Sequence, residues 1–328
     1  MADWRPTASL DILKLRARML ARIREFFAHR AVLEVDTPIL SATGIPDPHL
    51  RSLATRYTGP GAARGRTMYL HTSPEFAMKR LLAAGSGSIY QLCKVFRDNE
   101  AGRLHNPEFT MLEWYRVGCD HRALMSEVAE LVTGLLSAHI PLAATEALSY
   151  REAFQRHAGI DPHRAGHGQF ADCAARHGIH LPEDLAGQHD AALWRDLLLS
   201  HVVEPRLGAG RLTFVYDYPA SQAALARVRP GDPPLASRFE LYVNGIELAN
   251  GFHELADPAE QRTRFERQSH ARAAAGLPAV PLDERLLAAL TDGLPDCAGV
   301  ALGFDRLVML AAGAKNLEEV IAFPIARA

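Results

Sequence analysis

Several features are missing from this chain of 328 residues, and each absence excludes a class of protein. No run of 18 or more apolar residues occurs, so the sequence predicts no membrane-spanning helix. The first residues lack the basic and then apolar segments of a secretory signal. The four cysteines are too widely spaced for a disulfide framework or a paired-cysteine metal site. We therefore expect a cytoplasmic protein with no membrane contact.

An excess of charge of one sign is also missing. Lys and Arg number 36 and Asp and Glu number 38, which gives a formal net charge of −2. A protein that mainly grips long nucleic acid carries more basic surface than this. One local exception is the first predicted helix, where few acids stand among Lys14, Arg16, Arg18 and Arg22. This helix is a solvated face, a dimer face or a docking surface for an acidic partner, and the sequence leaves the three open.

The first half of the chain contains a long polar loop between two predicted strands, residues 89–97 and 108–117. Loops of hairpins usually have about 2–5 residues, so a longer, charged one between good strands is a candidate functional loop. A helix is predicted just before these strands, with Ser73 as its cap and Pro74 in its first position. A further strand is predicted over residues 31–40, and it stops at Thr37-Pro38, because the residue before a proline marks the end of an element.

A second hairpin is predicted around Asn244-Gly245, the pair that type I′ turns prefer. Its second strand carries Glu247, and Glu254 follows seven positions later. A regular pleat puts residues at an odd separation on opposite faces. If both carboxylates serve one site, the strand must bulge or must end near Gly251.

The last motif is a buried strand, residues 299–303, that continues into Arg306 and a helix. Hairpins together with segregated helices predict an α+β fold, an antiparallel sheet flanked by helices. Cations such as Arg97 and Arg306, together with the two carboxylates of the second hairpin, suggest nucleotide phosphates with magnesium. Mg²⁺ is typically held by one or two carboxylates plus substrate phosphates.

These segments resemble the signature motifs of class II aminoacyl-tRNA synthetases. Residues 96–100 and 103–115 are similar to motif 2, residues 299–306 to motif 3, and Thr37-Pro38 to motif 1. Residues 245–255 are similar to the metal and amino-acid segment of the lysyl-tRNA synthetase branch. The motifs occur in the family's order and at its spacing, from about residue 11 to the end of the chain.

Lysyl-tRNA synthetases carry an N-terminal anticodon-binding barrel, and here the motif 1 match is already reached at Pro38. The chain therefore resembles the freestanding paralogues of that branch, the elongation factor P–(R)-β-lysine ligases. We expect one class II synthetase-like catalytic domain over residues 1–328 and no anticodon-binding domain. Residues 137–235 form a less certain helical insert in this prediction. Helices are predicted around residues 123–136 and 191–207.

The resemblance implies an ATP-dependent ligase. (R)-β-Lysine would be activated as an adenylate and transferred to a lysine side chain of elongation factor P, with AMP and pyrophosphate as products. It also implies Mg²⁺, a homodimer and no tRNA. Two alternatives stay open: a truncated lysyl-tRNA synthetase-like enzyme that acylates RNA or a small molecule, and a catalytically inactive synthetase-like regulatory subunit.

The resemblance also implies roles for individual residues. The positions that match ATP-binding residues of the family are Arg97, Asn99, His105, Asn106, Phe109, Glu247, Leu248, Gly303 and Arg306. The positions that match substrate-binding residues are Ser73, Glu75, Glu113, Tyr115, Asn250, Glu254 and Ala301. Among these, Arg97 and Arg306 are expected to be catalytic, and Glu247 and Glu254 are expected to bind Mg²⁺.

Two positions depart from the family's pattern. Motif 2 usually reads Arg-x-Glu, whereas here Asn99 stands in the place of the acid and Glu100 follows it. Either residue can take the contact to adenine. Ala301 occupies a place where lysyl-tRNA synthetases have Gly, and its methyl group would enter the amino-acid pocket. That suits a substrate whose amine is placed differently.

Overall fold

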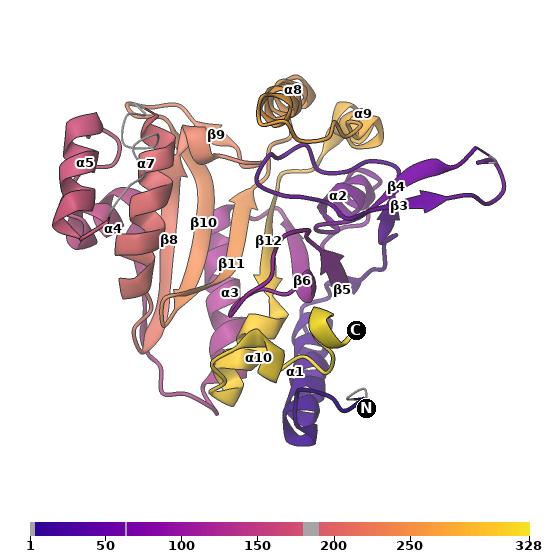
Figure 1. Cartoon of the computed structure of the whole chain (residues 1–328), viewed down its shortest axis with the longest axis horizontal. Coiled ribbons are helices and arrows are strands. Elements are labelled where there is room, and N and C mark those ends of the chain that lie inside the picture. The colour runs from indigo at the N-terminus through magenta and orange to yellow at the C-terminus, as the bar shows by residue number, and fades with distance from the viewer. Residues whose placement is uncertain (1–3, 63, 180–189) are drawn as a thin grey trace. The chain divides into compact units, whose positions relative to one another are not determined.

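The computed structural model describes residues 4–62, 64–179 and 190–328, and the chain divides into two compact units (Figure 1). Unit 1 comprises Met1–Cys119 and Ala256–Ala328, and unit 2 comprises Asp120–Leu255. The expectation of one catalytic domain over the whole chain stays a prediction. Among the described residues, no helix is long and apolar enough to cross a membrane.

Unit 1 combines a main set of strands, a small sheet and five α-helices in the described part of the chain. The main strands have the order β1 (Leu33–Glu34), β5 (Ile89–Phe96), β6 (Glu108–Val117), β12 (Cys297–Gly303) and form the main sheet of unit 1. The small sheet has the order β2 (Leu40–Ser41), β4 (Arg66–Leu70), β3 (Ala54–Tyr57). The helices are α1 (Leu10–Ala28), α2 (Glu75–Ala83), α8 (Pro258–Ala274), α9 (Glu284–Gly293) and α10 (Phe304–Ala312), and η4 (Leu317–Glu319) and η5 (Ile325–Arg327) are short 3₁₀ turns.

Helix α1 covers one face of the main sheet of unit 1. Ser9 caps it, because its Oγ accepts a hydrogen bond from the Ile12 backbone N at 3.3 Å. Apolar residues recur every four positions on the buried side of the helix: Leu15, Met19, Ile23 and Phe27. Phe27 stacks on Tyr90 of β5, with ring centroids 4.3 Å apart, and meets the Trp114 ring of β6 edge-on. The opposite face of the sheet is therefore the one that α1 leaves free.

Strands β5 and β6 confirm the two strands predicted around the long loop, and the helix after them begins close to its predicted start. The stop predicted at Thr37-Pro38 is confirmed, but the strand before it is shorter than expected: β1 covers only Leu33–Glu34, and β2 begins beyond Pro38. Proline donates no ladder hydrogen bond, and here the chain passes from the main sheet to the small one. Helix α2 begins one residue later than expected, with Pro74 as its N-cap, although Ser73 Oγ still accepts from the Glu75 backbone N.

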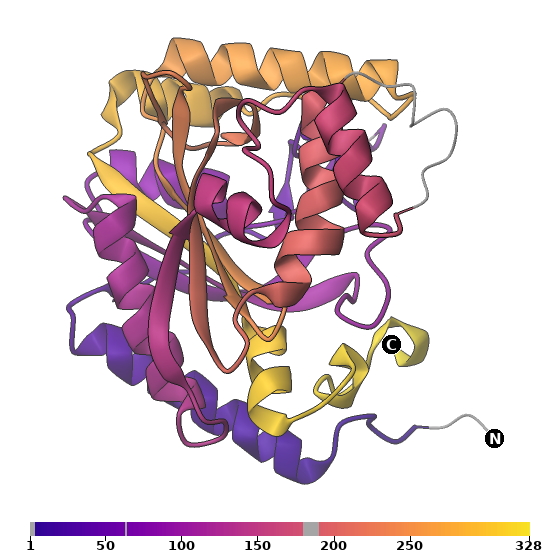
Figure 2. The ribbon, with the colours of Figure 1, turned by 90° about the vertical axis from the view of Figure 1, so that its left-hand side faces the viewer.

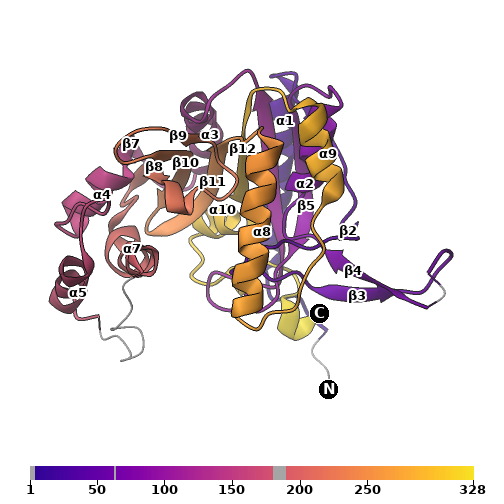
Figure 3. The ribbon, with the colours of Figure 1, turned by 90° about the horizontal axis from the view of Figure 1, so that it is seen from above.

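Helices α2, α8 and α9 lie side by side in unit 1 (Figure 3). The Phe76 ring of α2 packs against the Phe265 ring of α8 at 5.5 Å between centroids. Asp283 caps α9 by accepting from the backbone N of Arg285 and Leu286. These helices support the segment that carries two of the predicted substrate-binding residues.

Unit 2 consists of mostly antiparallel strands with helices packed on them. Its strand order is β11 (Ile246–His253), β10 (Leu235–Val243), β8 (Arg211–Pro219), β7 (Ala143–Ser149), and β9 (Val228–Arg229) also pairs with β10. Its described α-helices are α3 (His121–Leu136), α4 (Tyr150–His157), α5 (His167–Arg176) and α7 (Ala191–Leu198), and η1 (Leu199–Val203), η2 (Glu204–Arg206) and η3 (Ala220–Gln222) are short turns. Both units therefore support the predicted α+β class, with parallel pairing only at β1–β5 and β7–β8 among the described pairs.

In the region around residues 137–235, helices lie beside the strands of unit 2 (Figure 2). Their side chains share one hydrophobic core with those strands. Phe154, Phe170 and Trp194 from three successive described helices are buried there together with Tyr218 of β8. The helix predicted over residues 191–207 is shorter than expected, because α7 gives way to a π-helical turn and then a 3₁₀ turn that contains Pro205.

Candidate active site

The face of the main sheet that α1 leaves free carries an acidic residue from strand β6. Glu113 is 2% exposed, and its Oε1 accepts a hydrogen bond from the Tyr115 hydroxyl at 2.7 Å. Ala301 of β12 lies directly opposite Glu113 in the strand register, so both side chains are on the same face. A buried carboxylate beside a small residue is suited to binding a substrate amine.

The same face also carries a cysteine, Cys93, which is not a reactive nucleophile. Cys93 lies on β5 two positions along the ladder from the partner of Glu113, and burial, followed by the charge of Glu113, raises the pKa of the Cys93 thiol to about 12. A thiol with so high a pKa stays protonated at neutral pH and is a poor nucleophile. Covalent catalysis by this cysteine therefore has no support.

The long loop after β5 presents Arg97 against a ring and an acid. The Arg97 guanidinium lies over the Phe109 ring, 5.1 Å from its centroid, and its Nη1 is 3.6 Å from Glu100 Oε1. Asn99 is exposed and has a left-handed φ of 65°. Of the two candidates for the acidic position of motif 2, Glu100 contacts the arginine and Asn99 is open to solvent.

The strand–helix junction at the end of β12 brings two predicted phosphate ligands together. His105 Nε2 accepts a hydrogen bond from Arg306 Nη2 at 2.8 Å, and Arg306 Nε donates to the Leu104 carbonyl at 3.3 Å. Partial burial and then the Arg306 charge lower the pKa of His105. The imidazole is therefore neutral at neutral pH and can accept from the guanidinium.

Asn106 shapes the loop with both ends of its amide. Its Nδ2 donates to the Glu108 carbonyl at 2.6 Å, and its Oδ1 accepts from the Ile325 backbone N at 3.0 Å. The side chain is buried. Asn106 therefore ties the loop to the C-terminal segment, and its role in ATP binding stays a prediction.

Sequence reasoning missed one buried ion pair beneath this site. Asp305 is 1% exposed, pairs with Arg16 of α1, and accepts from the Thr110 backbone N at 2.7 Å. The sequence groups Arg16 with the other basic residues of α1 as a surface charge, which is wrong, because its side chain reaches the buried acid. An acid placed between a buried strand and a helix is the signal that predicts such a partner.

The segment before β5 supplies the remaining predicted substrate-binding residues of unit 1, and the predicted ATP-binding residue Gly303 ends β12. Glu75 Oε1 lies 2.6 Å from Lys79 Nζ, one helical turn along α2, and Lys79 is buried. Ser73 lines a pocket beside this helix. Before any substrate binds, one carboxylate oxygen of Glu75 already accepts a hydrogen bond from the Lys79 ammonium group.

Unit 2 carries the two predicted metal ligands on a strand with an irregular register. Leu241 of β10 pairs with Ala249, but its neighbour Tyr242 pairs with Glu247, so Leu248 is an extra residue in β11. One extra residue reverses the face of everything beyond it. Glu247 therefore shares a face with Asn250, and the strand bulges instead of ending at Gly251.

The bulge bears on the second predicted metal ligand as well, because the odd number of positions between Glu247 and Glu254 no longer puts them on opposite faces. Glu254 follows the strand, forms an isolated bridge with Ala226, and is 1% exposed. No group of three or more His, Cys, Asp and Glu able to hold a metal is found within residues 4–62, 64–179 and 190–328. Carboxylates are ligands that Mg²⁺ takes together with phosphates and water, so both side chains keep the chemistry expected of them.

A buried network in unit 2, which sequence reasoning missed, holds Asn250. Arg238 Nε donates to Asn250 Oδ1 at 3.2 Å, and Arg238 is ion-paired with Glu240. The Tyr218 hydroxyl donates to Glu240 Oε2 at 2.6 Å, and the Tyr242 hydroxyl donates to the same oxygen. The signal was a cation and an acid two positions apart in a predicted strand, which puts both side chains on one face.

The comparisons with known proteins agree with this geometry. The family of class II tRNA synthetases (D, K and N) matches residues 1–327, so the chain belongs to that family. The chain is also similar over its full length to proteins named elongation factor P–(R)-β-lysine ligase. The one from Edwardsiella ictaluri is 52% identical over 328 residues, which cover 100% of this chain and 99% of the relative. That from Vibrio vulnificus is 52% identical over 323 residues, 98% of each chain, and that from Klebsiella pneumoniae is 51% identical over 327 residues, 100% of this chain and 99% of the relative.

Proposed function

We propose that this chain is an ATP-dependent ligase that activates (R)-β-lysine and transfers it to a lysine side chain of elongation factor P. The observation that carries the proposal is the 52% identity to a relative of that name over 100% of this chain and 99% of the relative. The Glu113–Tyr115 pair and the His105–Arg306 pair support it, because they supply an amine-binding acid and phosphate-binding cations on one class II scaffold.

In the first proposed step, a carboxylate oxygen of β-lysine attacks the α-phosphorus of ATP and pyrophosphate leaves. Arg97 donates to the α-phosphate oxygens as negative charge builds up on them. Arg306 donates to the phosphates while Phe109 stacks on adenine. Glu113 and Glu75 bind the substrate amines, with Tyr115 and Ser73 as hydrogen-bonding partners.

Glu247 and Glu254 are proposed to bind Mg²⁺ together with the phosphates. When bound, the ion neutralises phosphate charge and so favours departure of pyrophosphate. Asn250 is proposed to donate its amide N–H groups to the substrate, since its carbonyl oxygen already accepts from Arg238. Leu248 and Gly303 provide backbone next to the nucleotide.

In the second proposed step, the ε-amine of the acceptor lysine attacks the carbonyl of the adenylate. The new amide bond forms, AMP leaves with the bonding electron pair, and the amine loses a proton to solvent. No side chain of the protein forms a covalent bond. Catalysis comes from positioning and charge neutralisation. The proposal includes a homodimer that acts on protein and not on tRNA.

Two assays test this function. RNA-free protein should catalyse ATP–pyrophosphate exchange that depends on (R)-β-lysine, and labelled β-lysine should then be found on elongation factor P. Absence of exchange with every lysine isomer would support the inactive alternative. Exchange followed by labelling of tRNA alone would support the truncated synthetase.

A further inference from the structure

One segment of unit 1 carries arginines but no acidic side chains, and its central hairpin projects from the rest of that unit. Residues 48–74 contain four arginines and no Asp or Glu, in a chain with a net charge of −2. The hairpin β3–β4 forms its centre and extends away from the helices and the main sheet of unit 1 (Figures 1 and 3). We name residues 48–62 and 64–74 the basic arm; its arginines are Arg51, Arg56, Arg64 and Arg66.

All four arginines of the basic arm are exposed, and none forms an ion pair with a described residue. Arg56 Nη2 donates to the Arg64 carbonyl at 2.7 Å, so its side chain lies across the hairpin. A Cβ at Gly65 would come within 2.0 Å of Arg56 Nε, and Gly65 also has a left-handed φ of 77°. The arm therefore holds Arg56 against its own backbone while its charge stays uncompensated. Tyr57 beside it is 41% exposed.

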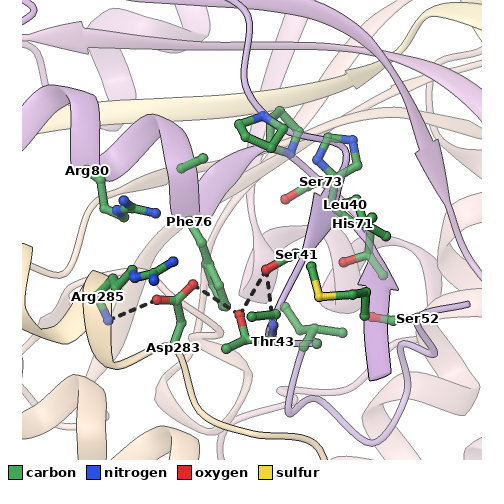
Figure 4. Close-up of a pocket in the computed structure, with 18 of the residues that line it drawn as sticks. Leu40, Ser41, Thr43, Ser52, His71, Ser73, Phe76, Arg80, Asp283 and Arg285 are labelled. Atoms are coloured by element: carbon green, nitrogen blue, oxygen red, sulfur yellow. Dashed lines mark hydrogen bonds between the residues drawn. The ribbon is translucent and has the colours of Figure 1, made fainter. Parts of the chain in front are cut away.

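A pocket of about 250 Å³ lies at the base of the basic arm (Figure 4). Arg66 belongs to both the arm and the pocket, and Arg80 and Arg285 line the pocket from α2 and α9. The acid of the pocket, Asp283, already accepts from Thr43 Oγ1 at 3.1 Å and from the first backbone N–H groups of α9. Three guanidinium groups against one engaged carboxylate make this pocket suitable for an acidic side chain.

Helix α1, the basic segment that the sequence draws attention to, offers less free charge. Arg16 is used in the buried pair with Asp305, Arg24 lies 3.1 Å from Glu34, and Lys14 lies 3.3 Å from Asp11. The Arg30 guanidinium lies 3.6 Å from the centroid of the Phe26 ring. The arm keeps all of its cations available, whereas α1 keeps mainly Arg18 and Arg22.

We propose that the basic arm and its pocket dock an acidic surface of the protein acceptor. This inference rests on the proposed function, because it requires a protein that receives the aminoacyl group. Exposed arginines with a neighbouring tyrosine are the side chains that contribute most at protein interfaces. A nucleic acid fits less well, since the chain as a whole is slightly acidic, with an isoelectric point of about 6.7.

The test compares two charge-reversed proteins, Arg56→Glu/Arg64→Glu on the basic arm and Arg18→Glu/Arg22→Glu on α1. Each changes two exposed arginines of unit 1 by the same amount of charge. We expect the arm variant to lower kcat/KM for elongation factor P by about tenfold or more, because steering of an acidic partner is lost. Its pyrophosphate exchange should match wild type, and the salt dependence of its transfer rate should flatten. The α1 variant should change transfer by less than about threefold, as expected for charges outside the interface.

Arg80→Gln with Arg285→Gln tests the pocket without changing the hairpin. Transfer should fall while exchange stays at the wild-type rate, because neither arginine is a proposed ligand of ATP or β-lysine; Ser73, the proposed substrate ligand that lines the same pocket, is left unchanged. Circular dichroism and exchange activity verify that each variant is folded.

The outcomes separate the inference from the proposed function. Wild-type protein that exchanges pyrophosphate but never labels elongation factor P contradicts the function. Wild-type protein that transfers, alongside an arm variant that transfers equally well, contradicts the docking surface alone. A larger defect in the α1 variant, or arm-dependent binding of tRNA that competes with elongation factor P, also overturns it.

Discussion

The two units prepare their parts of the proposed chemistry in different ways. In unit 1, a regular antiparallel ladder puts Glu113, Tyr115 and Ala301 on one face by simple alternation. In unit 2, Glu247 and Asn250 share a face only because β11 contains one extra residue. Regular strands need nothing more to aim their side chains, whereas an irregular strand needs other groups to hold its irregular geometry.

The supporting groups of the two units differ accordingly. Unit 2 holds Asn250 through Arg238, which is paired with Glu240 and surrounded by tyrosines. Unit 1 also has a buried pair, Arg16 with Asp305, but that pair holds the backbone of β6 and no predicted substrate ligand. A loss in the network of unit 2 should therefore affect substrate binding directly, and more strongly than a small change in the regular ladder of unit 1.

Removal of Arg238 should have the largest effect. Arg238→Met leaves the Glu240 carboxylate buried without its cation, and breaking one partner of a buried pair costs about 3–5 kcal/mol of unfolding free energy. Urea unfolding measures this loss. If the variant does not fold, Tyr218→Phe, which removes one hydrogen bond to Glu240, keeps the idea testable: it should raise KM for β-lysine more than it lowers kcat. An unchanged KM in a folded variant would show that the network only stabilises unit 2.

Glu247→Gln should nearly abolish adenylate formation. The amide keeps the size of the side chain but removes a proposed Mg²⁺ ligand, and loss of one such electrostatic contact lowers kcat by roughly 10²–10³. Pyrophosphate exchange measured over a range of Mg²⁺ concentrations checks the result. The matched control is Glu318→Gln, which makes the same change at an exposed acid of η4 and should leave exchange unchanged. Exchange close to the wild-type rate in Glu247→Gln would contradict the metal role.

Ala301→Gly should relax the choice of amino acid. The Ala301 methyl group lies opposite Glu113 in the register, so its removal opens space next to the proposed amine ligand. A steric difference of one methyl is worth about 1–3 kcal/mol, or roughly 10–200-fold in discrimination. Activation of α-lysine should rise relative to β-lysine by up to that range. The ratio of kcat/KM for the two isomers in exchange assays decides it, and an unchanged ratio would move specificity to other residues.

The smallest effect should come from pH. Burial and Arg306 lower the pKa of His105, so the neutral form accepts from Arg306 at neutral pH. Protonation as the pH falls below the ordinary value of about 6.5 removes that hydrogen bond and puts two cations side by side. The rate of pyrophosphate exchange should decline on the acid side. The fold-change in this rate should be smaller than the fold-change that Ala301→Gly causes in the kcat/KM ratio of the two isomers. His105→Gln, which can still accept, should remove the decline, and a profile unchanged in that variant would assign it to another group.

How much of this could be predicted depends on whether the signal is local. Strand β6 and the Asn244-Gly245 turn were predictable, because alternation and turn preference act over a few residues; both turn residues have the positive φ that type I′ requires. The bulge at Leu248 was only one of two possibilities, since register is set by the partner strand. Partners far apart in the sequence, such as Arg16 with Asp305, come from packing that no local pattern encodes.

The residues of the candidate site also divide into those with a local sequence signal and those whose contacts are set by packing. The positions of Arg97, His105 and Arg306 follow from motifs, and the structure places the last two within hydrogen-bond distance. The buried support of Asn250 does not follow from them, because a cation two positions from an acid in a strand is also compatible with an exposed pair. The end of the strand at Pro38, in contrast, did follow from the sequence, because a proline donates no ladder hydrogen bond.

The central claim is that the chain transfers activated β-lysine to a protein. The most direct measurement is intact mass spectrometry of elongation factor P after incubation with the chain, ATP, Mg²⁺ and (R)-β-lysine, with lysine-accepting tRNA present in the same tube as a competitor. The account predicts that elongation factor P gains the mass of one β-lysyl group on a lysine side chain and that the tRNA stays unacylated. Acylated tRNA with unmodified elongation factor P would contradict it.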